Sequence, residues 1–131
     1  MQSFPIVFVV SDSLGETAHR VARAAVSQFD APIEFRRASY VSSTEALDEV
    51  MAEAERQPCL IVHTLVQPEL RDYITRRAEQ AGIHVLDIMG PMLDKLSLIT
   101  ETPAKLQPGL LYQLDEEYFR EVEAVEFAVK Y

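Results

Sequence analysis

Four short segments with the pattern of β-strands alternate with segments of helical spacing along most of the chain. The strand-like segments are Phe4–Val10, Ile33–Val41, Cys59–Thr64 and Ile83–Ile88. Each is short and bounded by polar or turn-forming residues, and the first is a continuous apolar run, as is typical of strands buried in a parallel sheet. We therefore predict four β-strands.

The segments between these strands carry apolar residues at the spacing of an α-helix. Their expected buried faces are Ala18, Val21, Ala22, Ala25 and Phe29, then Ala46, Leu47, Val50, Met51 and Ala54, then Leu70, Ile74, Ala78 and Ala81. Ser13 with Glu16, and Ser42 with Glu45, have the spacing of capping boxes that open the first and second helices. Asp30-Ala31-Pro32 and Pro58 are expected to end these two helices, and Pro68 and Gly82 to begin and end the third.

The resulting β-α-β-α-β-α-β order, with short connections, predicts an α/β fold: an open parallel sheet of about four strands, in the order 2-1-3-4, flanked by helices on both faces. A short helix is expected from Gly90 to about Ile99, followed by an extended loop over Thr100–Leu110. We assign residues 1–113 to this α/β domain.

A C-terminal helical extension is expected over residues 114–131, with Asp115 as its N-cap. Glu117–Tyr131 contains no Gly, Asn or Pro that would end the helix. We therefore expect the chain to be the N-terminal part of a longer protein, and residues 114–131 to be the start of a helix that leads to a second domain.

Composition narrows the possible partners. The 131 residues carry a net charge of −9 with three lysines, which argues against binding to nucleic acid or to an anionic membrane surface. No apolar run approaches the length of a membrane span and no signal peptide is apparent, so a cytoplasmic location is expected. The single cysteine, Cys59, excludes an internal disulfide and is expected to be buried and inert, and the spacing of the His and Cys residues matches no metal site.

The loop after the first strand is the strongest candidate for a binding site. Its candidate ligand-binding residues are Ser11, Asp12, Ser13, Gly15, Glu16 and Thr17. Hydroxyl groups and the free amides of a helix N-terminus at the carboxyl end of a parallel sheet are suited to hold a phosphate. The alternative is a tight turn closed by the Ser13–Glu16 capping box, which needs no ligand.

His63 and Thr64, at the end of the third strand, are expected to line the same crevice, where His63 would bind phosphate or transfer a proton. The alternative for His63 is a structural histidine bonded to the backbone. An arginine from the pairs Arg36-Arg37 or Arg76-Arg77, or Arg71, is a further possible phosphate contact, although such residues are more often solvated. With only four glycines, the chain has neither a dinucleotide-binding nor a P-loop motif.

The segments Val9–Ala18 (VVSDSLGETA) and Ala22–Phe29 resemble the N-terminal half of the pyruvate, phosphate dikinase regulatory proteins, whose sister branch regulates phosphoenolpyruvate synthase. The resemblance continues through Gly90-Pro91-Met92-Leu93 and Pro108-Gly109. It is strongest over residues 114–119 and 123–131, and it covers the whole chain.

This resemblance implies a bifunctional serine/threonine kinase and phosphorylase. Members of the family phosphorylate a threonine of the dikinase with ADP and remove that phosphate with inorganic phosphate, releasing pyrophosphate. Their P-loop lies in the C-terminal half, so the resemblance implies that catalytic residues lie beyond Tyr131 and that this segment alone is inactive, holds no cofactor and serves in recognition or ligand binding. The implied partners are the dikinase or the synthase, and a second copy of the chain in a homodimer is possible.

Two alternatives from other classes remain open at this stage. In one alternative the chain is a stand-alone module that binds a small anion at the Ser11–Thr17 loop and at His63 and Thr64. In the other it is a dimerisation domain with an empty crevice.

Overall fold

The computed structural model describes residues 4–108 and 110. The elements in chain order are β1 (Ile6–Val10), α1 (Glu16–Val26), β2 (Glu34–Ala38), α2 (Thr44–Ala54), β3 (Cys59–His63), α3 (Pro68–Ala81), β4 (His84–Asp87) and α4 (Gly90–Thr100). Each predicted strand is present and lies within its predicted segment. The helix expected from Asp115, and with it the proposed boundary at residue 113, lies outside the described residues.

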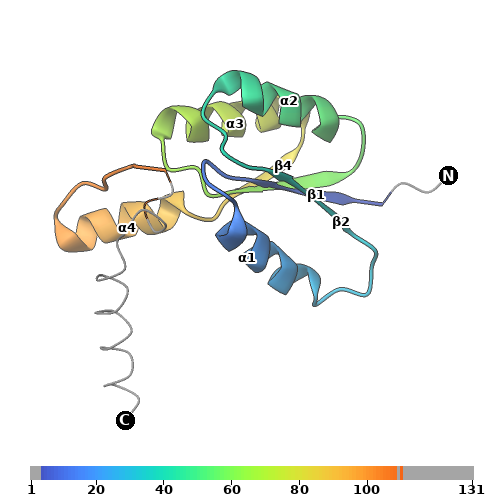
Figure 1. The fold of residues 1–131 in the computed structure, drawn as a ribbon, viewed down its shortest axis with the longest axis horizontal. Coiled ribbons are helices and arrows are strands. Elements are labelled where there is room, and N and C mark those ends of the chain that lie inside the picture. Colours follow the sequence, from blue (N-terminus) through green and yellow to red (C-terminus); the bar gives the residue numbers. More distant parts are fainter. Residues whose placement is uncertain (1–3, 109, 111–131) are drawn as a thin grey trace, which may run out of the picture.

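The four strands form one parallel sheet in the order β2-β1-β3-β4, which confirms the predicted α/β fold and strand order. Figure 1 shows α2 and α3 on one face of the sheet and α1 on the other. Val10, the last residue of β1, is paired with Ala38 of β2 and His63 of β3. The carboxyl ends of the two central strands therefore lie side by side.

The core has two layers because every residue of β1 is buried and alternate side chains point to opposite faces. Ile6, Phe8 and Val10 pack towards α2 and α3, whereas Val7 and Val9 pack towards α1. The larger layer also contains Leu47, Met51, Ile61 and Ile74, each with no exposed surface. This layer packs α2 and α3 against the sheet.

The buried face of α1 is narrower than its apolar pattern predicts. Only Ala18 and Ala22 are buried, while Val21 and Ala25 are exposed. Phe29 is 66% exposed because α1 ends at Val26, three residues before it. Ala18, Ala22 and the half-buried Val26 form the contact with the sheet, so the rest of the predicted face is left in solvent.

The other helices follow their predicted patterns more closely. The buried residues of α2 are Leu47, Val50, Met51 and Ala54, and those of α3 are Leu70, Ile74 and Ala78, while Ala46 is half-buried and Ala81 is exposed. Gly82 ends α3 with a φ of 70°, as expected of a C-terminal glycine.

The predicted capping box of α2 is wrong by one residue. Ser43, not Ser42, is the N-cap, and its hydroxyl accepts a hydrogen bond from the amide of Ala46 at 3.2 Å. Val41 is drawn into the core, so the chain turns into the helix one residue later than expected. α4 begins at Gly90 as predicted and continues to Thr100, which the prediction placed in the following loop.

Candidate functional site

A cavity of about 400 Å³ lies at the carboxyl edge of the sheet, between the start of α1, the side of α4 and the segment after α4. It is lined by Ser11, Asp12, Ser13, Gly15, Glu16, Thr17, Thr64, Val66, Met89, Leu93, Leu96, Ser97, Thr100, Thr102, Pro103, Ala104, Lys105, Leu106, Gln107 and Leu110. Seven of the eight candidate binding residues, all except His63, are in this lining. The structure thus brings together the loop after β1 and the residue after β3.

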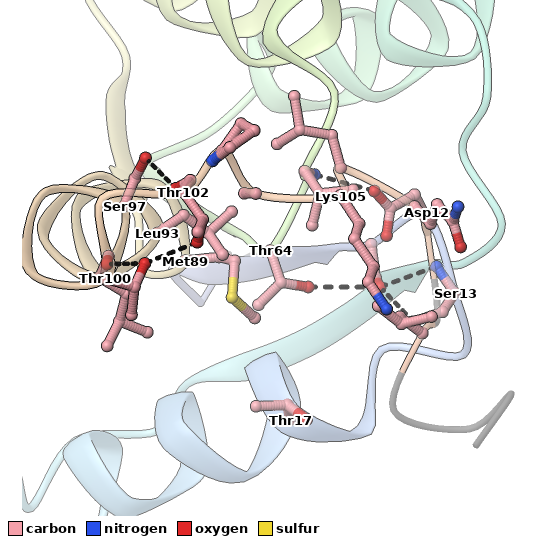
Figure 2. Close-up of a pocket in the computed structure, with 18 of the residues that line it drawn as sticks. Asp12, Ser13, Thr17, Thr64, Met89, Leu93, Ser97, Thr100, Thr102 and Lys105 are labelled. Atoms are coloured by element: carbon pink, nitrogen blue, oxygen red, sulfur yellow. Dashed lines mark hydrogen bonds between the residues drawn. The ribbon is translucent and has the colours of Figure 1, made fainter. Parts of the chain in front are cut away.

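Three hydroxyl groups form a connected cluster on the floor of the cavity (Figure 2). Ser11 Oγ accepts a hydrogen bond from the Ser13 amide at 3.0 Å and one from Thr64 Oγ1 at 3.3 Å. Ser13 Oγ lies 3.1 Å from Ser11 Oγ. Because both lone pairs of Ser11 Oγ are occupied, its hydrogen is directed to Ser13 Oγ, and the hydrogen of Ser13 is left to donate to another acceptor.

The predicted capping box of α1 is absent. Gly15 is the N-cap, in a left-handed conformation with a φ of 92°, and α1 has no side-chain cap among the described residues. The Ser13 hydroxyl is bonded to Ser11 instead of to an amide of the helix. Glu16 and Thr17 occupy the first turn of α1, where backbone amides lack intrahelical partners. This uncapped end borders the cavity.

Asp12 ties the loop after β1 to the loop after β3. Its carboxylate accepts a hydrogen bond from the amide of Val66 at 2.9 Å. Burial raises the pKa of Asp12, although the bonds from the amides of Val66 and of Asp12 itself oppose this rise. The side chain is therefore used to position the two loops against each other.

The expectation that His63 lines the crevice is wrong. Side chains alternate along β3, so His63 points to the same face as Ile61, towards α2 and α3, and it has no exposed surface. Its Nδ1 accepts a bond from the amide of Leu65 at 3.2 Å, and Nε2 has no partner among the described residues. Burial lowers the pKa of His63, which favours a neutral ring. Its position fits the structural alternative.

The opposite wall of the cavity was not identified from the sequence. It is formed by apolar side chains of Met89, Leu93 and Leu96 and by the segment that follows α4. Ser97 donates a hydrogen bond to the Thr102 carbonyl at 2.7 Å, which folds this segment back along the helix (Figure 2). Lys105 extends from it towards the side of the cavity formed by Ser13 (Figure 2). No carboxylate pairs with Lys105 among the described residues.

The start of α4 is fixed by Asp87, at the end of β4. Its carboxylate accepts bonds from the amides of Met89 at 3.0 Å and Gly90 at 2.6 Å, and from Nε of Arg71 at 2.9 Å. A Cβ atom at position 90 would collide with the guanidinium of Arg71 and the carboxylate of Asp87, so a side chain here would displace this ion pair. Arg71 is thereby held by Asp87 and does not line the cavity, contrary to its possible role as a phosphate contact.

The remaining candidate groups lie away from the cavity. On the surface, Arg36 forms ion pairs with Glu34 and Glu53. Arg77 forms an ion pair with Asp48. Cys59 is half-buried rather than buried, and burial raises the pKa of its thiol.

In residues 4–108 and 110, no three His, Cys, Asp or Glu side chains converge on a metal site, and no helix is long and apolar enough to cross a membrane.

The cavity combines two chemistries. One side offers hydroxyl donors, the amide end of α1 and an ammonium group, all suited to an oxyanion. The other side is apolar and suits the body of an organic molecule. The geometry therefore fits an organic anion better than a bare ion.

Comparison with known proteins agrees with the resemblance seen in the sequence. A family model described as "Kinase/pyrophosphorylase" matches residues 7–131. A protein from Carboxydothermus hydrogenoformans is 48% identical over the whole chain, and one from Halalkalibacterium halodurans is 51% identical over 97% of it. A third, from Shouchella clausii, is 48% identical over 96% of the chain.

All three relatives bear the name "Putative pyruvate, phosphate dikinase regulatory protein". The chain spans 47–48% of their length, or about half. The match of the family model covers nearly the whole chain, and the relatives are similar across the same region. The chain therefore belongs to the kinase/pyrophosphorylase family.

Proposed function

We propose that this chain is the N-terminal domain of a regulatory protein that reversibly phosphorylates a threonine of pyruvate, phosphate dikinase. In the forward reaction ADP donates its β-phosphoryl group to the threonine hydroxyl and leaves as AMP. In the reverse reaction inorganic phosphate attacks the phosphothreonine and leaves as pyrophosphate. The family match over residues 7–131, with three relatives named for regulation of this dikinase, carries the proposal.

Within that protein, this domain binds a ligand that bears a phosphate group. The domain does not itself catalyse transfer of that group. Support comes from the cavity at the carboxyl edge of the sheet, where the free hydrogen of Ser13, the ammonium group of Lys105 and the uncapped start of α1 flank one space. Two carboxylates also line this space: that of Asp12 accepts a bond from the amide of Val66, and that of Glu16 lies in the first turn of α1. No P-loop motif is present in the sequence to position a nucleotide for phosphoryl transfer.

The test of the first proposal compares this chain with the whole protein encoded by its gene. Each is incubated with ADP and purified dikinase, and in parallel with phosphoenolpyruvate synthase, and phosphothreonine is measured by mass spectrometry. We expect phosphothreonine on the dikinase with the whole protein and none with this chain alone. A gene whose reading frame stops directly after the Tyr131 codon, or a whole protein inactive on both enzymes, would refute it. Modification of the synthase instead would assign the chain to the sister branch.

The test of the second proposal measures ligand binding to this chain by calorimetry, with ADP, AMP and inorganic phosphate. Ser13→Ala removes the free hydroxyl donor and is expected to weaken binding about fivefold to tenfold. Ser42→Ala is the matched control, because Ser42 is exposed and has no hydrogen bond within the described structure. Equal affinities of the two variants would show that the cavity is not the binding site.

A stand-alone anion-binding module is the second candidate function. It is favoured by one observation, namely that the cavity is built from this chain without any other domain. Tight binding of one of these ligands, together with a whole protein that lacks kinase activity, would support the module over the regulatory kinase.

A further inference from the structure

A second hollow lies between α1 and the edge strand β2 in the described part of the chain. It is lined by Glu16, His19, Arg20 and Arg23 of α1 and by Arg37 of β2. We call Arg20, Arg23 and Arg37 the arginine patch. All three side chains are exposed, and β2 is an edge strand, so no strand of the sheet lies on its outer side beside Arg37. Figure 1 shows α1 on the face of the sheet opposite α2 and α3.

The charges of the arginine patch are not neutralised by the described part of the chain. Other arginines, such as Arg36 and Arg71, are paired with carboxylates. By contrast, no carboxylate of the described residues lies within 4.0 Å of the guanidinium of Arg20, Arg23 or Arg37. Three arginines without a carboxylate partner among the described residues are thus gathered in one place on a chain with a net charge of −9.

Local contacts hold part of the patch in place. The guanidinium of Arg37 donates to Nδ1 of His19 at 2.5 Å, and the His19 ring meets Phe35 edge to face with 5.3 Å between ring centres. The pKa of His19 is lowered by burial, and further by the charges of Arg37 and Arg23. The charges of Arg37 and Arg23 thus add to the effect of burial in disfavouring a protonated His19 ring.

The chemistry of the patch favours carboxylates carried on one segment. The planar guanidinium group matches a carboxylate in geometry. Contacts at exposed sites are individually weak, so they give useful affinity together only when the carboxylates are carried on one molecule. A nucleic acid is disfavoured because proteins that bind it neutralise many phosphates, whereas here three arginines stand on an acidic molecule. We propose that the arginine patch is a docking surface for an acidic segment of a partner protein.

This proposal is independent of the cavity and of the function proposed above. Its test uses a fluorescent oligo-glutamate peptide and fluorescence anisotropy at about 50 mM salt, where exposed charges are weakly screened. The variant Arg20→Ala/Arg23→Ala is expected to bind about tenfold more weakly than the parent chain. The matched control is Arg56→Ala/Arg76→Ala, which removes two exposed arginines elsewhere and changes the net charge equally. Its affinity is expected to stay within about twofold.

Several outcomes would overturn the proposal. One is the absence of peptide binding by the parent chain, and another is an equal loss in both double variants, which would mark a net-charge effect only. Tighter binding of a single-stranded DNA oligonucleotide at the patch, or displacement of the peptide by millimolar inorganic phosphate, would assign the patch to another ligand. Circular dichroism of both variants confirms that the fold is retained.

A second measurement reports on contact rather than affinity. Bound carboxylates offset the field of the arginines, so the pKa of His19, followed by NMR, is expected to rise when the peptide is added. The charged groups that face His19 are Glu16, Arg20 and Arg23 of α1 and Arg37 of β2, with Phe35 as the apolar neighbour. A pKa of His19 that does not change in the presence of saturating peptide would show that the peptide binds elsewhere.

Discussion

Removal of the Asp87 carboxylate should destabilise the protein more than removal of any nearby exposed acid. Its two oxygens accept three hydrogen bonds, from the amides of Met89 and Gly90 and from Nε of Arg71. The side chains of Asp87 and Arg71 are only 21% and 19% exposed. The substitution Asp87→Ala therefore leaves two amides without their cap and a largely buried guanidinium without its main partner.

The magnitude follows from these contacts. Loss of the cap costs about 1 kcal/mol. Breaking a fully buried ion pair costs about 3–5 kcal/mol, and the partial exposure of this pair brings that figure to about 2 kcal/mol. We expect Asp87→Ala to lower the free energy of unfolding by about 3 kcal/mol, and Asp87→Asn by about 2 kcal/mol because the amide oxygen still caps α4.

Urea unfolding at pH 7, followed by circular dichroism, measures these differences. The control is Asp94→Ala, whose side chain is 69% exposed and lies 3.8 Å from Arg71, with an expected loss below about 0.5 kcal/mol. A loss for Asp87→Ala no larger than that of the control would refute the reasoning that this carboxylate holds α4 to the sheet.

The effect of Asp87 should also depend on pH. Burial raises the pKa of its carboxyl, but the amide of Gly90 and other neighbours, Arg71 among them, more than offset this and lower it overall. A lowered pKa in the folded state gives stability that is present above the unfolded pKa, about 4, and is lost as pH falls through the folded pKa. The difference between the parent chain and Asp87→Asn should therefore narrow below about pH 4.

Three further predictions concern the loop, the buried histidine and the cavity. Gly15→Ala should lower the stability of the protein by about 1 kcal/mol, because a residue with a Cβ atom is strained at the φ of 92° found here. A thermal melt measures this, and an unchanged melting temperature would contradict it. Burial lowers the pKa of His63, so the unfolded chain binds a proton at this residue more readily than the folded chain, and the free energy of unfolding should fall as pH drops below about 6.5. In urea unfolding, the free energy of unfolding of His63→Gln should fall less steeply with pH than that of the parent chain, and an equal pH dependence of the two would contradict this. Lys105→Ala should weaken phosphate binding about threefold to tenfold in calorimetry with no change in melting temperature, and an unchanged affinity would place the anion elsewhere.

The strands, the helices and their order could be predicted because their signals are local. A run such as Ile6–Val10 and the helical spacing of Leu47, Val50 and Met51 each depend on residues close in sequence. The meeting of Ser11 and Thr64 also followed, since the carboxyl ends of neighbouring parallel strands share one edge. Whether these residues bind a ligand remains a prediction.

Features that depend on a single-residue choice were less predictable. His63 was expected in the crevice, but alternation along β3 sends its side chain to the opposite face and leaves Thr64 at the cavity. The N-cap of α2 was misplaced by one residue because two adjacent serines, Ser42 and Ser43, can each serve as a cap. The start of α1 was misplaced because Ser13 bonds Ser11 and Gly15 begins the helix without a side-chain cap. The spacing of the polar residues in the sequence does not show which of them will be the N-cap of the helix.

The wall formed by α4 could not be inferred because its position depends on contacts distant in sequence. Nothing local shows that Leu93 and Lys105 face Ser13 across a cavity. The one signal available was Gly90-Pro91, which starts α4 at the end of β4 and hence at the same edge as the loop after β1. Its direction from there is set by the bonds of Asp87, which no periodic pattern encodes.

The two sides of the cavity differ in how firmly they are held. The floor follows directly on β1 and β3, and every residue of β1 is buried. By contrast, of the eleven residues of α4, all within the described part of the chain, only Gly90 is buried. Local opening should therefore begin at the far end of α4, near Thr100, and proceed towards the anchor at Asp87. A ligand that bridges both sides would slow hydrogen exchange in α4 far more than in β1, because it would add most to the element with the least stability of its own.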